Sequence, residues 1–111
     1  MSIGNKGMEN GLKKIKFSIV TVCLNAESTI LETIRSVKQQ KYPNYEYVIW
    51  DGLSKDHTLE IIRENAGADN IYVFSKKDSG LYNAMNQAAK ECNGDYILFL
   101  NSGDIFADER V

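Results

Sequence analysis

The sequence predicts an α/β fold in which a mainly parallel sheet lies between two layers of helices. Short apolar, β-branched segments alternate with amphipathic ones, in the order strand–helix three times and then a final strand. The segments expected to be strands are apolar almost throughout, as in sheets that are covered on both faces. The 111 residues, of which 43% are hydrophobic, suffice for the core of one small domain.

The first half of the chain predicts two strands and the helix between them. Residues 17–23 are short, β-branched and mostly apolar, which is typical of a buried strand. From residue 28 to 39 the apolar side chains recur at helical spacing, so that they form one stripe. Pro43 disfavours helical geometry at the residue before it, which predicts that the helix ends there. A second strand is expected over residues 45–50.

A loop over residues 51–56 follows the second strand. Asp56 at its end is a residue type that caps helices, and it predicts a helix that runs to about Asn65. A turn then leads into a third short strand over residues 71–74.

The last part of the chain predicts one more helix and one more strand. Residues 81–92 place apolar side chains, beginning with Leu81, at the spacing of a buried helical face. Gly94 follows closely and predicts a left-handed cap at the end of this helix. Residues 96–100 are expected to form the fourth strand.

Composition and charge exclude several classes of protein. The net charge is −2, but residues 1–16 carry +3 and form an expected flexible leader, whereas the remainder carries −5. An acidic body of this kind argues against a nucleic-acid-binding protein, and it is typical both of a solvated surface and of a site for a divalent cation. Only Cys23 and Cys92 are present, and no signal peptide is recognised, which predicts a cytoplasmic protein with free thiols.

Acidic residues follow every predicted strand, at the edge of the sheet where parallel α/β folds bind ligands. Asp51 and Asp104 come directly after apolar strands and are the better candidates for ligand contact. Asp56 is expected to cap a helix, and Glu27 is equally compatible with a cap and with a ligand contact. The single histidine, His57, is expected to lie on the surface at the start of a helix.

Three common binding or catalytic motifs are absent from the sequence. It contains no GxxxxGK[ST] loop, no GxGxxG turn after the first strand and no G-x-S-x-G elbow. A phosphate-bearing ligand would therefore need another source of positive charge, and a divalent cation held by an acid is the expected one.

Five segments, in this order and at this spacing, resemble family 2 nucleotide-sugar glycosyltransferases of the A-type fold. They are residues 18–27 (Ser-Ile-Val-Thr-Val-Cys-Leu-Asn-Ala-Glu), 36–52 (with Gln-Lys-Tyr-Pro-Asn and a final Asp-Gly), 54–58 (Ser-Lys-Asp-His-Thr), 75–87 (with Asp-Ser-Gly-Leu-Tyr-Asn-Ala-Met-Asn) and 94–104 (ending in Asn-Ser-Gly-Asp). Each segment alone is a weak signal, whereas the ordered set is specific.

The resemblance implies a Rossmann-like three-layer sandwich of the nucleotide-diphospho-sugar transferase type, truncated after its donor-binding half. It implies an inverting, metal-assisted transfer of a sugar from a nucleotide-diphosphate donor, with UDP favoured, to an acceptor hydroxyl. The expected setting is bacterial polysaccharide or cell-surface glycan synthesis, with a glycan or lipid-linked acceptor, in the cytoplasm or at the inner face of the membrane. Residues 17–111 would form this donor-binding half.

The resemblance also assigns roles by position. Asp51 would accept a hydrogen bond from the base, and Asp104 would bind Mg²⁺ or Mn²⁺ that bridges the diphosphate. The family often has two acids around this last position, whereas this chain has only Asp104, so weak metal affinity is expected without the nucleotide. The nucleotide-binding residues are expected to be Thr21, Val22, Asn25, Glu27, Asp51 and Asp78.

No catalytic residue is assigned, because the base of this family lies in the acceptor-binding half, expected beyond Val111. A nucleotide-binding or interaction module without catalysis remains an alternative. A phosphoacceptor receiver is disfavoured, because Asn25 and Glu27 rather than paired acids follow the first strand. Half of a larger sheet is also expected to expose apolar surface, which favours a homodimer.

Overall fold

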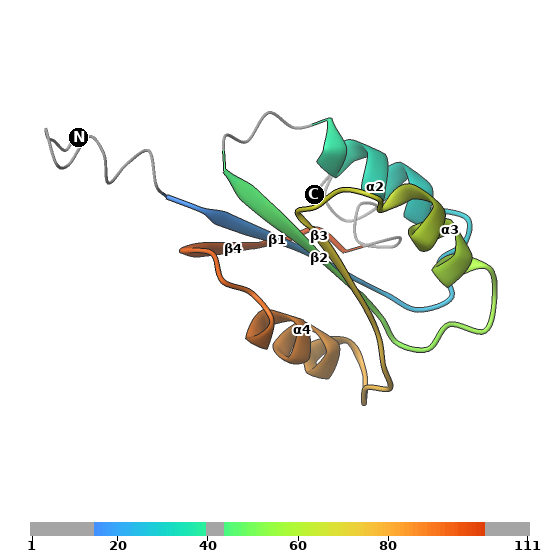
Figure 1. Ribbon diagram of the computed structural model, residues 1–111. Coiled ribbons are helices and arrows are strands. Elements are labelled where there is room, and N and C mark those ends of the chain that lie inside the picture. The colour runs from blue at the N-terminus through green and yellow to red at the C-terminus, as the bar shows by residue number, and fades with distance from the viewer. Residues whose placement is uncertain (1–14, 40–43, 102–111) are drawn as a thin grey trace, which may run out of the picture.

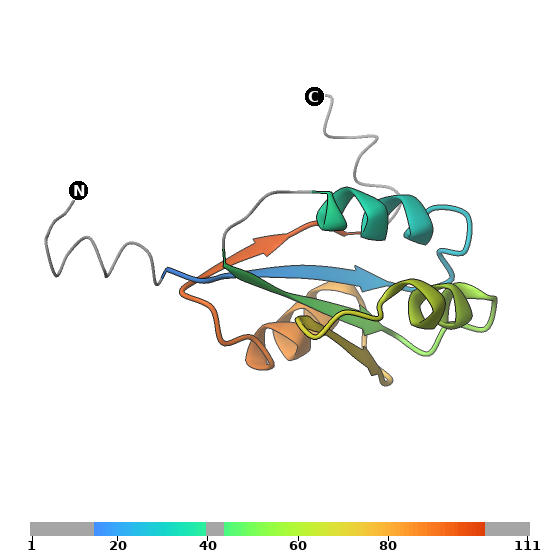
Figure 2. The same ribbon diagram turned by 45° about the horizontal axis from the view of Figure 1, so that its top comes forward.

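Four parallel strands form one sheet in the computed structural model, which describes residues 15–39 and 44–101. All strands point the same way, in the order β3–β2–β1–β4 (Figure 2). The bounds of the four strands agree with the predicted segments to within one residue, and the predicted parallel sheet is confirmed. They are β1 (Phe17–Cys23), β2 (Tyr45–Asp51), β3 (Ile71–Ser75) and β4 (Tyr96–Phe99).

Helices cover both faces of the sheet and complete a three-layer sandwich (Figure 1). Helices α2 (Ile30–Lys38) and α3 (Thr58–Asn65) lie on one face, and α4 (Leu81–Lys90) lies on the other. The reason is the strand order: the chain moves from β1 to β3 in one direction and then returns past β1 to β4. Right-handed crossovers place the helix of the return connection on the opposite face.

Alternate side chains of the central strands face opposite helical layers, so the core divides into two clusters. The cluster under α2 and α3 contains Ile19, Tyr47 and Ile49 of the strands, together with Ile30 and Ile34 of α2. The cluster under α4 is smaller, and its buried residues are Val20, Val22, Val48, Trp50, Ala84 and Ala88. The two-sided burial explains why β1 and β2 are apolar on both faces.

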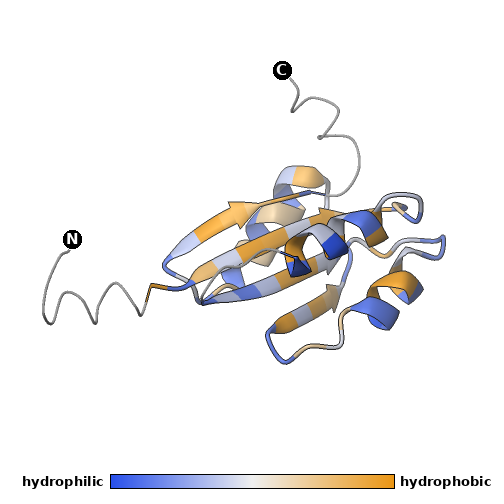
Figure 3. Ribbon diagram, turned by 90° about the horizontal axis from the view of Figure 1, so that it is seen from above, coloured by the Kyte–Doolittle hydropathy of each residue, from blue (hydrophilic) through white to orange (hydrophobic). Residues whose placement is uncertain are grey.

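β4 differs from the other strands because its side chains are exposed. It pairs only with β1 in the described chain, and its four residues, Tyr96 to Phe99, are each between 38% and 57% exposed. Figure 3 shows that most of this strand is nevertheless hydrophobic. The described chain therefore exposes apolar surface at the β4 edge.

Two details of the predicted last helix are wrong. Leu81, the first residue of the helix, is 46% exposed, and the buried positions are Ala84 and Ala88, one turn apart on the face towards the sheet. Gly94 does not adopt a left-handed conformation. A glycine is nevertheless required at position 94, because a Cβ there would lie 2.7 Å from the backbone nitrogen of Ser18.

Several predictions fall on segments outside the described residues. These are most of the expected leader over residues 1–16, the break at Pro43 and the proposed metal ligand Asp104. Within residues 15–39 and 44–101, no helix is long and apolar enough to cross a lipid bilayer.

Candidate functional site

The carboxyl ends of β1, β2 and β3 form one aligned row. Cys23 pairs with Asp51, and Asp51 pairs with Ser75, so three polar side-chain positions cross the sheet at the same level. The strand order reverses beside this row, between β1 and β4. Open α/β sheets bind ligands at such a reversal, outside the carboxyl ends of the strands. The fold therefore places the candidate site at this edge.

Asp51 lies at the centre of the row and is fully buried. Its Oδ2 accepts hydrogen bonds from the backbone N–H of Ser54 at 3.1 Å and from the Ser75 hydroxyl at 2.9 Å. Its Oδ1 accepts a hydrogen bond from the Ser54 hydroxyl. The carboxylate is thus held by two serines that sequence reasoning missed. The only local signal is the turn that Asp51 followed by Gly52 indicates, in which an Asp side chain commonly bonds to nearby backbone.

The Cys23 thiol also faces this carboxylate, with its sulfur 4.0 Å from Asp51 Oδ1 and 3.6 Å from the carbonyl oxygen of Trp50. Burial, followed by the charges of Asp51 and Asp56, raises the pKa of Cys23 to about 12. The thiol is therefore protonated near neutral pH, so it acts as a weak hydrogen-bond donor and not as a nucleophile.

Asp78 approaches the same edge from the loop after β3 and is half-buried. Its Oδ2 accepts a hydrogen bond from the indole N–H of Trp50 at 3.1 Å, and its Oδ1 accepts one from the backbone N–H of Gly80 at 3.0 Å. A Cβ at Gly52 would lie 2.6 Å from Asp78 Oδ2, so a glycine at this position makes room for the carboxylate. Asp51 and Asp78 therefore belong to one edge, as predicted.

Thr21 and Val22 lie in β1 at the strand-order reversal, and both are buried. The Thr21 hydroxyl donates to the carbonyl oxygen of Leu100 at 2.5 Å and lies 2.7 Å from the Tyr47 hydroxyl. The backbone N–H of Val22 donates to Asn101 Oδ1 at 3.2 Å. These bonds fix the end of β4 against β1. Asn101 is thus a third site residue, after Ser54 and Ser75, to which sequence reasoning gave no role.

Asn25 has a left-handed φ of 50° and joins the loop after β1 to the loop after β2. Its backbone N–H donates to Ser54 Oγ at 2.8 Å, and its Oδ1 accepts the backbone N–H of Lys55 at 2.8 Å. Leu53 in the second loop has a φ of 66°, which is rare for a bulky residue and is found mainly at constrained turns and functional sites. Glu27, also in the first loop, is exposed and faces His57.

No group of three His, Cys, Asp or Glu side chains suited to a metal ion occurs in the described part of the chain. Asp51 and Asp78 already accept hydrogen bonds from protein groups. The described residues therefore do not form a metal site by themselves.

The family model for glycosyl transferase family 2 matches residues 18–111. The chain belongs to this family. Its match extends over all four strands and over the loops that form the candidate edge.

Two curated glycosyltransferases illustrate the extent of the similarity. The glucosyltransferase WfaP of Escherichia coli, whose name specifies UDP-Glc and a GlcNAc-diphosphoundecaprenol, is 33% identical over 85% of this chain and 38% of its own length. The poly(ribitol-phosphate) β-N-acetylglucosaminyltransferase TarS of Staphylococcus aureus (strain Mu50) is 30% identical over 87% of this chain and 18% of its own length. The chain thus spans well under half of the length of these two relatives.

Solved structures of S. aureus TarS share the fold of this family 2 chain. The complex of TarS with UDP-GlcNAc superposes with a TM-score of 0.71 at 30% identity, and covers 78% of this chain and 26% of the TarS chain. The complex with UDP gives a TM-score of 0.72 at 28% identity over 86% of this chain and 31% of that one. The predicted nucleotide-diphospho-sugar transferase type of α/β fold is therefore confirmed.

Proposed function

We propose that this chain holds the nucleotide-sugar-binding half of an inverting, metal-assisted glycosyltransferase of bacterial cell-surface glycan synthesis. The observation that carries the proposal is the row of Cys23, Asp51 and Ser75 beside the strand-order reversal, in a chain that belongs to glycosyl transferase family 2. Asn25 and Asp78 extend the row from the loops on either side.

The proposed donor is a uridine-diphosphate sugar. TarS has been solved with UDP-GlcNAc and with UDP, and the name of WfaP specifies UDP-Glc. Asp51 would accept the ring N–H of uracil, a charge-assisted bond that favours uracil over bases without that donor. Because Ser54 covers Asp51 in the structure, base binding requires the Ser54 hydroxyl to give way, and the left-handed Leu53 marks the turn that would move.

Asp104 is the proposed contact for Mg²⁺ or Mn²⁺, and it lies outside the described residues. When bound, such an ion would stabilise the charge that develops on the diphosphate leaving group. The described residues do not form a three-ligand site, so we expect the metal to bind together with the diphosphate, whose oxygens complete its ligand set.

The acceptor and the catalytic base are proposed to belong to the remainder of a longer protein. The chain spans 38% of WfaP and 18% of TarS, so most of each relative lies outside the matched part. The name of WfaP specifies an acceptor linked to a diphospho-lipid, and a lipid-linked or glycan acceptor at the inner face of the membrane is proposed here too.

Calorimetric titration of the folded chain with UDP, CDP and GDP, with and without Mn²⁺, tests the proposal. We expect UDP to bind more tightly than the other two nucleotides, and Mn²⁺ to strengthen the binding. Asp51→Asn should weaken UDP binding at least tenfold, which corresponds to about 1.4 kcal/mol. Asp69→Asn is the matched control, because Asp69 is exposed in the turn before β3, at the opposite edge of the sheet.

The variant Asp104→Asn should abolish the part of the affinity that depends on Mn²⁺ and leave the remainder. Absence of binding by all three nucleoside diphosphates would refute the donor-site proposal. Equal binding of the three would refute the role of Asp51 in selecting uracil.

A further inference from the structure

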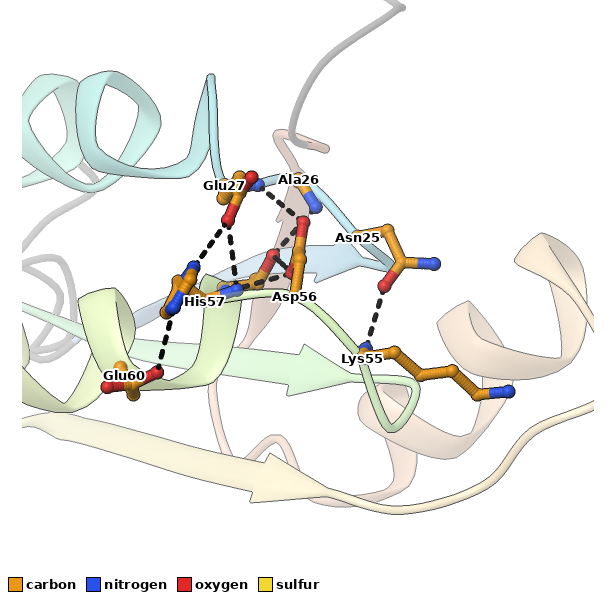
Figure 4. A network of polar contacts seen from close by, with 8 residues as sticks. Asn25, Ala26, Glu27, Lys55, Asp56, His57 and Glu60 are labelled. Atoms are coloured by element: carbon orange, nitrogen blue, oxygen red, sulfur yellow. Dashed lines mark hydrogen bonds and ion pairs between the residues drawn. The ribbon is translucent and has the colours of Figure 1, made fainter.

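Two loops at the edge of the site exchange hydrogen bonds through acidic side chains (Figure 4). The backbone N–H of Glu27, in the loop after β1, donates to Asp56 Oδ2 at 3.2 Å. In return, the backbone N–H of His57, in the loop after β2, donates to Glu27 Oε1 at 3.0 Å. Each loop thus supplies a carboxylate for the other, and we call Glu27, Asp56 and His57 the loop clasp.

The loop clasp is anchored in the buried start of α3. Asp56 Oδ1 accepts hydrogen bonds from the backbone N–H of Thr58 at 2.9 Å and from its hydroxyl at 2.5 Å. Thr58 is fully buried, and its Oγ1 accepts the backbone N–H of Ala26 at 2.7 Å. The positions of Asp56 and Ala26 are therefore fixed by the core, whereas the contact between Glu27 and His57 lies at the exposed end of the network.

The imidazole ring adds a contact that depends on charge. His57 Nδ1 lies 3.0 Å from Glu27 Oε1, and its Nε2 lies 3.9 Å from Glu60 Oε1 on α3. Asp56 is the third acid near the ring, whereas the side chain of Lys55 extends away from it (Figure 4). Two carboxylates thus contact the ring and a third lies near it, so its protonated form is favoured.

We propose that Glu27 and His57 are positioning residues, which hold the loop after β1 against the loop after β2 so that Asn25 and, once the Ser54 hydroxyl gives way, Asp51 face the nucleotide together, and that protonation of His57 tightens this hold. The inference rests on the proposed function, because it assigns a consequence for UDP binding. It gives Glu27 a role different from the direct nucleotide contact that the family resemblance implied, since its carboxylate is turned to His57.

The direction of the pH dependence follows from the neighbours of His57. The hydrogen bond to Glu27, followed by the charges of Glu60, Glu27 and Asp56, raises the pKa of His57 above its ordinary value. A raised pKa means that protonation favours the folded, closed form of the clasp. The stabilisation is complete below about pH 6.5 and is lost as the pH rises through the raised pKa of His57.

The first experiment examines the clasp without any ligand. NMR titration of His57 and amide hydrogen exchange of Glu27 and His57, at one pH, are compared between the wild type and Glu27→Gln. We expect the substitution to lower the pKa of His57 and to accelerate both amides several-fold. Glu64→Gln is the matched control, since Glu64 is an exposed carboxylate on α3, outside the network of Figure 4.

An unchanged pKa of His57 together with unchanged exchange in Glu27→Gln would overturn the proposal, whether or not the chain binds UDP. This experiment needs no nucleotide, so it tests the loop clasp even if the chain does not bind UDP.

The second experiment measures UDP affinity at pH 6.0 and pH 8.0 for the wild type and for His57→Gln. The diphosphate itself titrates in this range, so its own titration must be cancelled. The quantity to compare is therefore the dissociation constant of His57→Gln divided by that of the wild type, at each pH. We expect His57→Gln to bind about threefold more weakly than the wild type at pH 6.0, the size of an exposed ion-pair effect, and nearly equally at pH 8.0. A ratio of one at both pH values, with UDP bound, would overturn the positioning role while leaving the proposed function intact.

Discussion

The most informative stability test concerns Glu46, a buried carboxylate at the amino end of β2. It is 2% exposed, and its Oε2 accepts hydrogen bonds from the Ser18 hydroxyl and the backbone N–H of Asn93, both at 2.6 Å. The ammonium group of Lys16 lies 3.4 Å from Oε1. One side chain thus joins β1, β2 and the turn before β4, and Glu46→Gln removes its charge while it keeps its shape.

The expected magnitude follows from these contacts. A hydrogen bond to a charged group contributes about 1.5–3 kcal/mol, against about 0.5–1.5 kcal/mol for a neutral one. Two such bonds become neutral in Glu46→Gln, and the side-chain amide then faces the ammonium of Lys16. We therefore expect the free energy of unfolding to fall by about 2 kcal/mol. The ion pair itself adds little, because the Lys16 side chain is 35% exposed.

Urea unfolding at pH 7 measures this change. With a slope of about 1–3 kcal/mol per molar urea, the midpoint should fall by about 1 M. Asp69→Asn, at an exposed carboxylate in the turn before β3, is the control and should leave the midpoint unchanged.

A pH series adds a second, independent signature. Burial alone would raise the pKa of Glu46, but the hydrogen bonds from Asn93 and Ser18 and the charge of Lys16 lower it below the ordinary value. A lowered pKa means that the stabilisation is present above about pH 4.3 and is lost as the pH falls through the folded-state pKa. The difference between wild type and Glu46→Gln should therefore shrink in acid. A difference below about 0.5 kcal/mol at pH 7 would refute the reasoning, since changes that small are usual for surface substitutions.

Two further predictions concern exposed positions. Leu53 is 49% exposed and has a φ of 66°, a conformation that strains a leucine but not a glycine. Leu53→Gly should therefore raise the free energy of unfolding by up to about 1 kcal/mol in urea titrations. A loss of stability would contradict the inferred strain. Ile97 is 38% exposed on β4, and Ile97→Lys should shift any self-association of the chain towards monomer in sedimentation velocity, because a lysine on an edge strand blocks strand pairing. Unchanged sedimentation of an associating chain would place the contact elsewhere.

Local patterns in the sequence predicted the elements well. The β-branched segment at residues 17–23 and the apolar stripe from residue 28 to 39 correspond to β1 and α2, although the helix begins only at Ile30. The case of Gly94 shows where local reasoning ends. A glycine after a helix predicts a left-handed cap, but the glycine is required by its approach to Ser18, a residue 76 positions earlier, which only strand pairing reveals.

The sequence by itself determined the order of the elements, the parallel sheet and the acidic residues at its carboxyl edge, because these depend on spacing along the chain. Only the tertiary structure decided what each acid contacts. Asp51, expected to be available to a base, is enclosed by Ser54 and Ser75, and Glu27 is turned to His57. These partners, other than Ser54, come from segments more than 20 residues away. Strand register and loop packing bring them together, and neither is encoded in the local pattern around the acid.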